Sequence, residues 1–192
     1  MGFTLGQGSY VPATIRLAAA VRPPTRARLR FASRLAVWPY RLSIARALGF
    51  DTVVLDQGIL QSAWCILLEG SLGKEAPLEN ALGKVLAGCE ADFAFISVDL
   101  DVTSAAGRIE ARGPMAAPFD RGREETLRLL AQHRDQLDQV VAAGVRVSGA
   151  PHLRIDGSRP PAENAASIDA FVDRVLSLRA PKHQPRMTGV HE

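Results

Sequence analysis

Aspartates follow two short apolar runs in this sequence. Residues 53–55 lead into Asp56 of a D-Q-G turn, and residues 93–98 lead into Asp99 and Asp101. A carboxylate at the end of a buried strand either forms a turn or provides the acidic residue of an active site, where it can hold a divalent cation. Both roles stay open for Asp56. For Asp99 and Asp101 we expect helix capping and a solvated strand end.

Arginines that could neutralise phosphate follow the second of these runs. Arg108 and Arg112 are four residues apart and therefore share a face of a helix. Guanidinium groups side by side suit phosphate oxygens, which they bind through charge-assisted hydrogen bonds. A solvated helical face is the alternative, and we favour phosphate because both arginines lie just past the end of a strand. His133 and His152 show no base–nucleophile pattern, and we expect structural roles for both.

The basic residues are unevenly distributed along the chain. Residues 1–50 contain eight arginines and no acidic residue, whereas the other 142 residues contain 15 basic and all 20 acidic residues. A basic segment on a mildly acidic body favours an anionic partner such as phosphate, nucleic acid or lipid. We place this polyanion site in the arginine-rich segment 22–34. A solvated arginine-rich helix is the alternative.

Length and composition indicate one folded domain. At 192 residues with 47% hydrophobic residues, the chain can bury a core of α/β size. Its longest apolar stretches are far shorter than the roughly 20 residues of a membrane span, so no span is expected. Cys65 and Cys89 stand in apolar surroundings without a partner motif. They predict inert thiols in a reduced, cytoplasmic compartment and argue against a zinc site.

Helical and extended segments alternate along the chain. We expect an irregular N-terminal segment over residues 1–24, an α/β domain over 25–178 and a disordered tail over 179–192. Within the domain, the patterns predict strands at 51–56, at 93–98 and within 145–155, and helices at 25–48, 59–69, 78–86, from residue 103, from after the loop 113–122 to Gly144, and at 162–178. Pro39 should kink the first of these helices or divide it in two.

This alternation also predicts where a ligand would bind. Strands that alternate with helices imply right-handed crossovers and a parallel sheet. In such a sheet, ligands bind beyond the carboxyl ends of the strands. Asp56, Asp99 and Asp101 each follow a predicted strand, so the pattern places all three at that edge. This placement favours a functional role for Asp56.

Three segments taken together resemble a known family of enzymes. They are the strand that ends in D-Q-G at 56–58, the segment ISVDLDVTSAAGRIEARG at 96–113, and the segment IDGSRPPAENAASIDAFV at 155–172. In order and spacing they resemble the P-loop nucleoside and nucleotide kinases, most closely the thymidylate-kinase-like group, over residues 30–178. The resemblance implies a three-layer α/β fold, with a parallel sheet between flanking helices. It also implies ATP-dependent phosphoryl transfer to a nucleotide or small phosphate acceptor.

The same resemblance implies catalytic roles for three residues. Asp56 occupies the place of the carboxylate with which the family holds Mg²⁺ or engages the phosphate acceptor. Arg108 and Arg112 match the R-x-x-x-R pattern of the family's lid arginines. Such arginines neutralise the charge on the phosphoryl group in transfer, because this reaction needs cations around the moving oxygens more than covalent help.

Four further residues would contact the ATP phosphates or nucleotide by the same resemblance. Arg121 and Arg123 lie in and just after the lid-like loop and would add positive charge there. Ser158 and Arg159 belong to the D-G-S-R-P-P turn, which resembles the segment that passes near adenine in these kinases. The cofactors implied are therefore ATP and Mg²⁺.

The phosphate-cradling motif of the family is absent. The sequence contains no G-x-x-x-x-G-K-[ST], and the segment LEGSLGKE at 68–75 lacks the first glycine and the Ser/Thr. The family's first strand, central between those corresponding to 52–56 and 93–98, also has no counterpart. We therefore expect an N-terminally shortened kinase-like chain, or a sheet repaired by direct pairing or by a strand from a partner. In either case we expect negligible kinase activity.

A function without catalysis is the alternative. The kinase-like body would then be a scaffold, and the arginine-rich N-terminal helix would bind polyanions in a salt-dependent manner. Loss of that binding when Arg26, Arg28, Arg30 and Arg34 become alanine would favour this hypothesis. A homo-oligomer is compatible with both functions.

Overall fold

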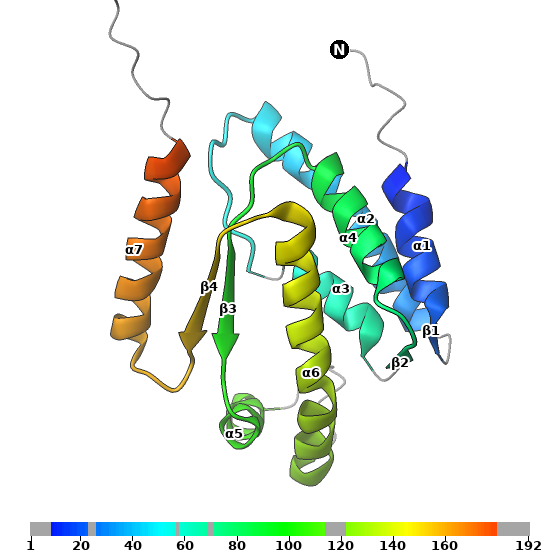
Figure 1. The fold of residues 1–192 in the computed structure, drawn as a ribbon. Coiled ribbons are helices and arrows are strands. Elements are labelled where there is room, and N and C mark those ends of the chain that lie inside the picture. The colour runs from blue at the N-terminus through cyan, green and yellow to red at the C-terminus, as the bar shows by residue number, and fades with distance from the viewer. Residues whose placement is uncertain (1–8, 23–25, 57, 69–70, 114–121, 180–192) are drawn as a thin grey trace, which may run out of the picture.

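The computed structural model describes residues 9–22, 26–56, 58–68, 71–113 and 122–179. These residues form seven helices and four short strands (Figure 1). In chain order the elements are α1 (Tyr10–Ala20), β1 (Val21–Arg22), α2 (Arg26–Ala47), α3 (Ile59–Leu67), β2 (Ser71–Leu72), α4 (Ala76–Gly88), β3 (Phe95–Asp99), α5 (Val102–Arg112), α6 (Arg123–Ser148), β4 (His152–Asp156) and α7 (Pro161–Arg179). The described part of the chain is therefore α/β, with far more helix than strand.

The main core lies among α1, α2, α3, α4 and the C-terminal half of α6 (Figure 1). Each helix turns an apolar stripe toward the others, because its apolar residues recur every three or four positions. The inward residues include Leu17, Leu35, Ile66, Leu82 and Val140, all fully buried. This bundle positions the outward faces of α1 and α2.

Two small sheets connect the helices. β1 and β2 pair antiparallel and join the α1–α2 connection to the α3–α4 connection. β3 and β4 pair parallel, with Phe95 opposite His152 and Asp99 opposite Asp156. The carboxyl ends of the two parallel strands therefore meet at one edge, as expected for an α/β chain.

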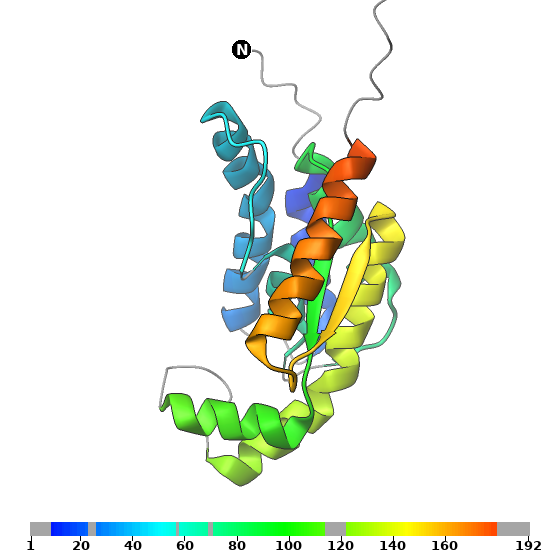
Figure 2. The same ribbon diagram turned by 90° about the vertical axis from the view of Figure 1, so that its left-hand side faces the viewer.

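Helices α6 and α7 lie on opposite sides of the β3–β4 pair (Figures 1 and 2). On one face Ile155 is buried next to α7, whose Phe171 and Val175 are also buried. On the other face the Asp99 carboxylate contacts Arg134 of α6 at 2.8 Å. This division follows from the strand period of two, which sends alternate side chains to opposite faces.

The expected three-layer sheet of a P-loop kinase is not found in the described residues. Their parallel sheet has two strands, β3 and β4. Residues 51–56 form no strand, so the expected strand and its direct pairing with 93–98 are both wrong. Val54 is 91% exposed in that segment. An apolar run becomes a strand only where a neighbouring strand pairs with its backbone, and no strand in the described part of the chain pairs with residues 51–56.

The N-terminal segment expected to be irregular is helical over α1. Its inward residues Ala13, Leu17 and Ala18 are buried, and this packing stabilises the helix. Pro12 is tolerated because it stands in the first turn, where backbone amides have no partner within the helix. The helix expected at 25–48 is confirmed as α2. Pro39 does not divide it, since α2 continues through this residue as one element.

Helix α6 extends past Gly144, where the sequence predicts its end. It stops at Ser148, and Gly149 follows with φ +64°, a left-handed conformation that favours glycine. At Gly144 a Cβ would lie 2.5 Å from Cδ2 of Leu60, so glycine allows α6 and α3 to approach closely. The strand expected within 145–155 therefore begins only at His152. The predicted tail, apart from Arg179 at the end of α7, lies outside the described residues.

Candidate functional site

The carboxyl edge of the β3–β4 pair is the place where the sequence predicts a ligand. The turn after β4 closes over this edge, because the Gly157 amide donates to the Asp99 carbonyl at 2.6 Å. Arg108 of α5 then donates through Nη2 to the Gly157 carbonyl at 2.7 Å. The structure therefore brings Arg108 next to the turn 156–159, two segments that the kinase resemblance assigns to one site.

The aspartates at this edge bind the local backbone. Asp101 caps α5, as expected: its carboxylate accepts from the Ser104 amide at 2.9 Å, and hydrogen bonds from Ser104 lower the pKa of the aspartate. Asp156 accepts from the Ser158 hydroxyl at 2.6 Å and amide at 2.8 Å, which lowers its pKa in the same way. Within the described ranges, no group of three or more acidic, His or Cys side chains could hold a metal ion.

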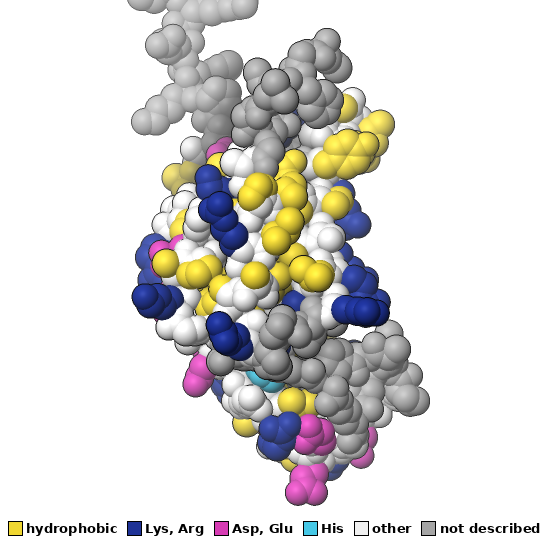
Figure 3. Space-filling view, turned by 90° about the vertical axis from the view of Figure 1, so that its right-hand side faces the viewer, with side chains coloured by type: hydrophobic (Ala, Val, Ile, Leu, Met, Phe, Trp, Pro, Cys, Tyr) yellow, Lys and Arg dark blue, Asp and Glu magenta, His cyan; other side chains and the backbone are white. Residues whose placement is uncertain are grey.

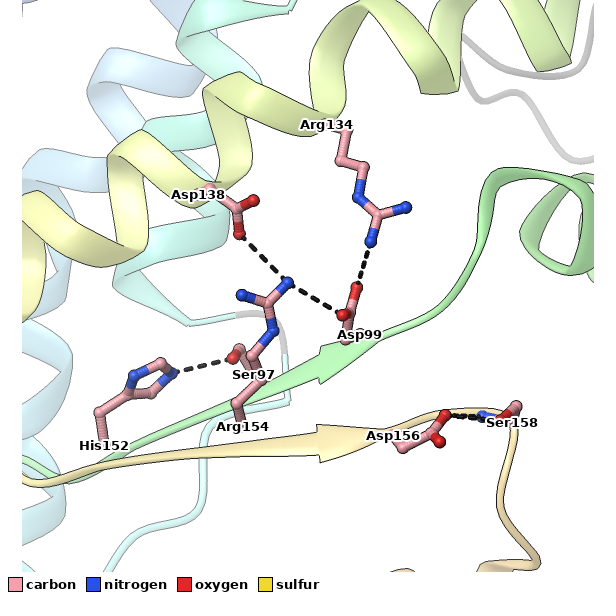
Figure 4. A network of polar contacts seen from close by, with 8 residues as sticks. All are labelled: Ser97, Asp99, Arg134, Asp138, His152, Arg154, Asp156 and Ser158. Atoms are coloured by element: carbon pink, nitrogen blue, oxygen red, sulfur yellow. Dashed lines mark hydrogen bonds and ion pairs between the residues drawn. The ribbon is translucent and has the colours of Figure 1, made fainter.

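Asp99 lies between two guanidinium groups (Figure 4). Arg134 of α6 contacts one carboxylate oxygen at 2.8 Å, and Arg154 of β4 contacts the other at 2.9 Å. Arg154 also lies 3.8 Å from Asp138 of α6. Two positive charges are thus balanced by two negative ones. This balance ties α6 to the sheet and leaves no net positive charge for a phosphate.

Ser97 and His152 form a contact that sequence analysis missed. The Ser97 hydroxyl lies 2.9 Å from Nε2 of His152 (Figure 4). Burial, and then the charge of Arg154, lower the pKa of His152, so the imidazole is neutral at neutral pH. Among the residues described, none is hydrogen-bonded to its other ring nitrogen, so the orienting group of a triad is not found. No local pattern reveals this pair, because only the β3–β4 register brings the two residues together.

A cavity of about 180 Å³ lies beside this network, between β3 and α6. Trp64 and Leu137 contribute apolar walls, and Asp99 and Arg154 contribute polar ones. Sites for small organic ligands usually enclose about 300–1,000 Å³. The cavity is therefore small for a nucleotide.

Two of the predicted catalytic residues, Asp56 and Arg112, lie exposed on the surface. Asp56 lies in an exposed turn between α2 and α3 and does not end a strand. Arg112 is exposed in the last turn of α5, where a cation interacts favourably with the helix dipole. The expectation that Asp56 ends a buried strand is therefore wrong, because the strand itself is not formed.

The predicted nucleotide-binding residues mostly contact acidic side chains of the protein. Arg123 pairs with Glu110 at 2.7 Å. Arg159 lies 3.7 Å from Asp156, which also accepts the Ser158 hydrogen bonds. Arg121 lies outside the described residues. Arg123 and Arg159, to which the resemblance assigns contacts with ATP, thus have acidic partners within the chain.

The N-terminal arginines differ from these paired arginines in their surroundings. Six of them are exposed along α1, β1 and α2, and we call them the cationic face: Arg16, Arg22, Arg26, Arg30, Arg34 and Arg41. Figure 3 shows basic side chains on both sides of a group of hydrophobic ones on the face that includes α1. In the described part of the chain, none of the six forms an ion pair with a carboxylate. The cationic face is therefore open to an external anion.

Two of these arginines are held on the surface by aromatic rings. The guanidinium carbon of Arg34 lies 5.4 Å from the centre of the Phe31 ring, and that of Arg41 lies 5.1 Å from the Trp38 ring. Such cation–π contacts orient a guanidinium group without neutralising its charge. Both groups remain available to an anion.

Comparisons with models of known protein families, with curated proteins and with solved structures found no match for this chain. Within the described residues, no helix combines the length and apolar character needed to cross a bilayer.

Proposed function

We propose that this chain is a non-catalytic binding module, whose cationic face on α1, β1 and α2 binds anionic macromolecular surfaces. The observation that carries the proposal is that six exposed arginines have no carboxylate partner within the described ranges. A guanidinium group without an internal partner gains most from an external phosphate, to which it can donate two parallel hydrogen bonds.

The rest of the molecule gives the contrast that supports this proposal. Arginines outside the cationic face are commonly paired, as in Arg123–Glu110, Arg128–Glu125 and Arg146–Glu79. Residues 1–50 contain no acidic side chain that could pair with the six. The positive charge is thus concentrated on one surface, where it attracts polyanions and speeds their encounter.

Salt-dependent binding to a fluorescent duplex DNA oligonucleotide, used as a generic polyanion, tests the proposal. The variant Arg26→Gln/Arg30→Gln/Arg34→Gln should bind more weakly. Its plot of log K against log salt should lose a slope of about 2.7, because each phosphate contact contributes about 0.9 on B-DNA. Arg28 is left unchanged because it is 3% exposed and belongs to the core. Fluorescence anisotropy over a salt series measures both quantities.

The matched control removes three exposed arginines that have carboxylate partners: Arg123→Gln/Arg128→Gln/Arg159→Gln. It makes the same change in net charge and should keep the wild-type slope. An equal loss of slope in both variants would show that net charge alone governs binding, and binding without salt dependence would rule out the proposal.

A phosphotransferase related to nucleotide kinases is the second candidate. The contact of Arg108 with the turn that contains Ser158 favours it, since the resemblance assigns both to one nucleotide site. Without the phosphate-cradling loop, we expect ATP with Mg²⁺ to leave Tm unchanged and not to be turned over. A Mg²⁺-dependent rise in Tm that Asp56→Asn abolishes would instead favour the kinase. Thermal-shift measurements and an ATP-turnover assay decide between these outcomes.

A further inference from the structure

An exposed apolar patch lies within the cationic face. Its residues are Val11 and Ile15 on α1 and Leu29, Val37, Tyr40 and Ile44 on α2, each between 39% and 57% exposed. We call these six residues the apolar patch. Figure 3 shows hydrophobic side chains gathered on this side of the molecule, with basic side chains at both borders.

Helical geometry makes the α2 part of the patch a continuous stripe. Val37, Tyr40 and Ile44 recur at intervals of three and four residues and share a stripe of α2. The opposite stripe of α2, which includes Leu35 and Leu42, is buried in the core. Both helices thus have apolar residues on two sides. The inner side packs in the core, and among the described residues nothing buries the outer side. Such a surface on a folded protein usually marks a binding site.

The charge around the patch decides which kind of partner covers it. A second copy of this chain would bring six further arginines against the first six, and no acidic residue of α1 or α2 could offset their repulsion. A nucleic acid would bind the arginines through its phosphates and would leave the aliphatic side chains without a contact. Among the patch residues, only Tyr40 could stack on a base.

An anionic bilayer surface uses both features. Its phosphates lie at the level of the arginine head groups, and the boundary with the acyl chains lies just below, where aliphatic side chains gain from burial. Arg30, Arg34 and Arg41 border the apolar stripe along one edge of α2 and would lie in the head-group layer. We infer that the cationic face and its apolar patch bind the surface of a membrane rich in anionic phospholipids. This inference rests on the proposed function and names the partner of the same site.

Flotation with extruded vesicles tests the inference on the full chain. One vesicle preparation contains phosphatidylcholine alone, and the other contains equal amounts of phosphatidylcholine and phosphatidylglycerol. The wild-type chain should float with the second preparation only. The variant Ile15→Ser/Val37→Ser/Ile44→Ser should lose more than about tenfold in vesicle affinity while it keeps its binding to duplex DNA and the salt slope.

The matched control replaces exposed apolar residues elsewhere: Val54→Ser/Val98→Ser/Leu178→Ser. These side chains are 91%, 57% and 76% exposed. Both variants thus replace three exposed aliphatic side chains by serine, at different locations. The control should bind the phosphatidylglycerol-containing vesicles and the duplex DNA as tightly as the wild type does. Circular dichroism and Tm measurements check that each variant is folded. If the triple variant is unfolded, the single variants Ile15→Ser and Val37→Ser replace it, and each should lose part of the vesicle affinity.

The possible outcomes separate the two proposals. DNA binding with no vesicle binding overturns the lipid inference and leaves the proposed function intact. Vesicle binding that survives the three serine substitutions is purely electrostatic and also overturns the inference. Equal loss in the control places the lipid contact outside the patch. Failure to bind either DNA or anionic vesicles overturns both proposals together.

Discussion

Arginines in residues 1–50 have two different uses in the folded chain. Arg28 is 3% exposed and donates to the Leu68 carbonyl at 3.3 Å, so it links α2 to the end of α3. Arg46 donates to the Cys89 carbonyl at 2.6 Å and pairs with Glu90 at 3.2 Å, so it links α2 to the end of α4. The six arginines of the cationic face make no such internal links to acidic groups in the described residues.

This difference predicts unequal effects on stability. Arg28→Ala should lower the free energy of unfolding by about 2 kcal/mol, because it removes a buried charge-assisted hydrogen bond and the packing of its stem. Arg30→Ala changes an exposed side chain and should remain within about 0.5 kcal/mol of the wild type. Urea denaturation measures both values. Equal changes in the free energy of unfolding would mean that burial does not make Arg28 more important for stability than Arg30.

Thiol burial is a second property of single residues. Burial raises the pKa of Cys65, and it raises the pKa of Cys89 to about 12. Both thiols therefore stay protonated at neutral pH and react slowly, since the thiolate is the nucleophile. This agrees with the inert thiols expected from the apolar sequence around them.

Among the elements, the turn that joins β4 to α7 shows how close packing selects glycine. A Cβ on Gly157 would lie 2.9 Å from Cγ1 of Val98 and 3.0 Å from the Asp99 carbonyl oxygen. The Gly157 amide also donates to that oxygen at 2.6 Å, so the backbone of the turn cannot easily move away. The turn holds Arg108, and with it α5, against the sheet.

Alanine substitution at two glycines tests this packing. Gly157→Ala should lower the free energy of unfolding by about 1–3 kcal/mol, because the added methyl group meets backbone atoms. Gly107 lies inside α5, and apart from the backbone of that helix a methyl group there would have nothing within 4 Å. Gly107→Ala should therefore raise stability by up to about 1 kcal/mol through helix propensity. Denaturant melts of both variants check the opposite signs. A neutral Gly157→Ala would mean that the turn can relax.

At the scale of the whole molecule, the exposed arginines of the cationic face and the main hydrophobic core belong to the same helical bundle. The bundle of α1 to α4 and the end of α6 contains the large buried cluster and displays the cationic face. The β3–β4 pair, between α6 and α7, carries balanced ion pairs around Asp99. The bundle can therefore present charge outward without destabilising its interior, since the exposed arginines remain in water.

Two apolar substitutions test this division between buried and exposed surface. Leu35 is fully buried in the bundle, and Leu35→Ala should lower the free energy of unfolding by about 2–5 kcal/mol. Val54 is 91% exposed, and Val54→Ala should remain within about 0.5 kcal/mol of the wild type. A buried strand at 51–56 would instead make both substitutions costly. Thermal and urea unfolding distinguish these results.

The sequence by itself determined the features that depend on neighbouring residues. The amphipathic helix α2, the cap of α5 by Asp101 and the apolar surroundings of both cysteines all follow from residues within a few positions of one another. The acid-free, arginine-rich character of residues 1–50 is likewise a property of composition. These features indicate helices in an α/β chain and a concentration of positive charge in residues 1–50.

Only the tertiary structure decided which of these residues are exposed and which meet. The run at 53–55 has the composition of a buried strand, but a strand requires a partner distant in sequence, and none pairs with it among the described residues. The Ser97–His152 contact likewise depends on the register of β3 and β4. Arg28 lies on the side of α2 that faces the core, whereas Arg30 lies on the side that faces solvent. Burial and pairing are properties of contacts between distant segments, and local sequence does not specify them.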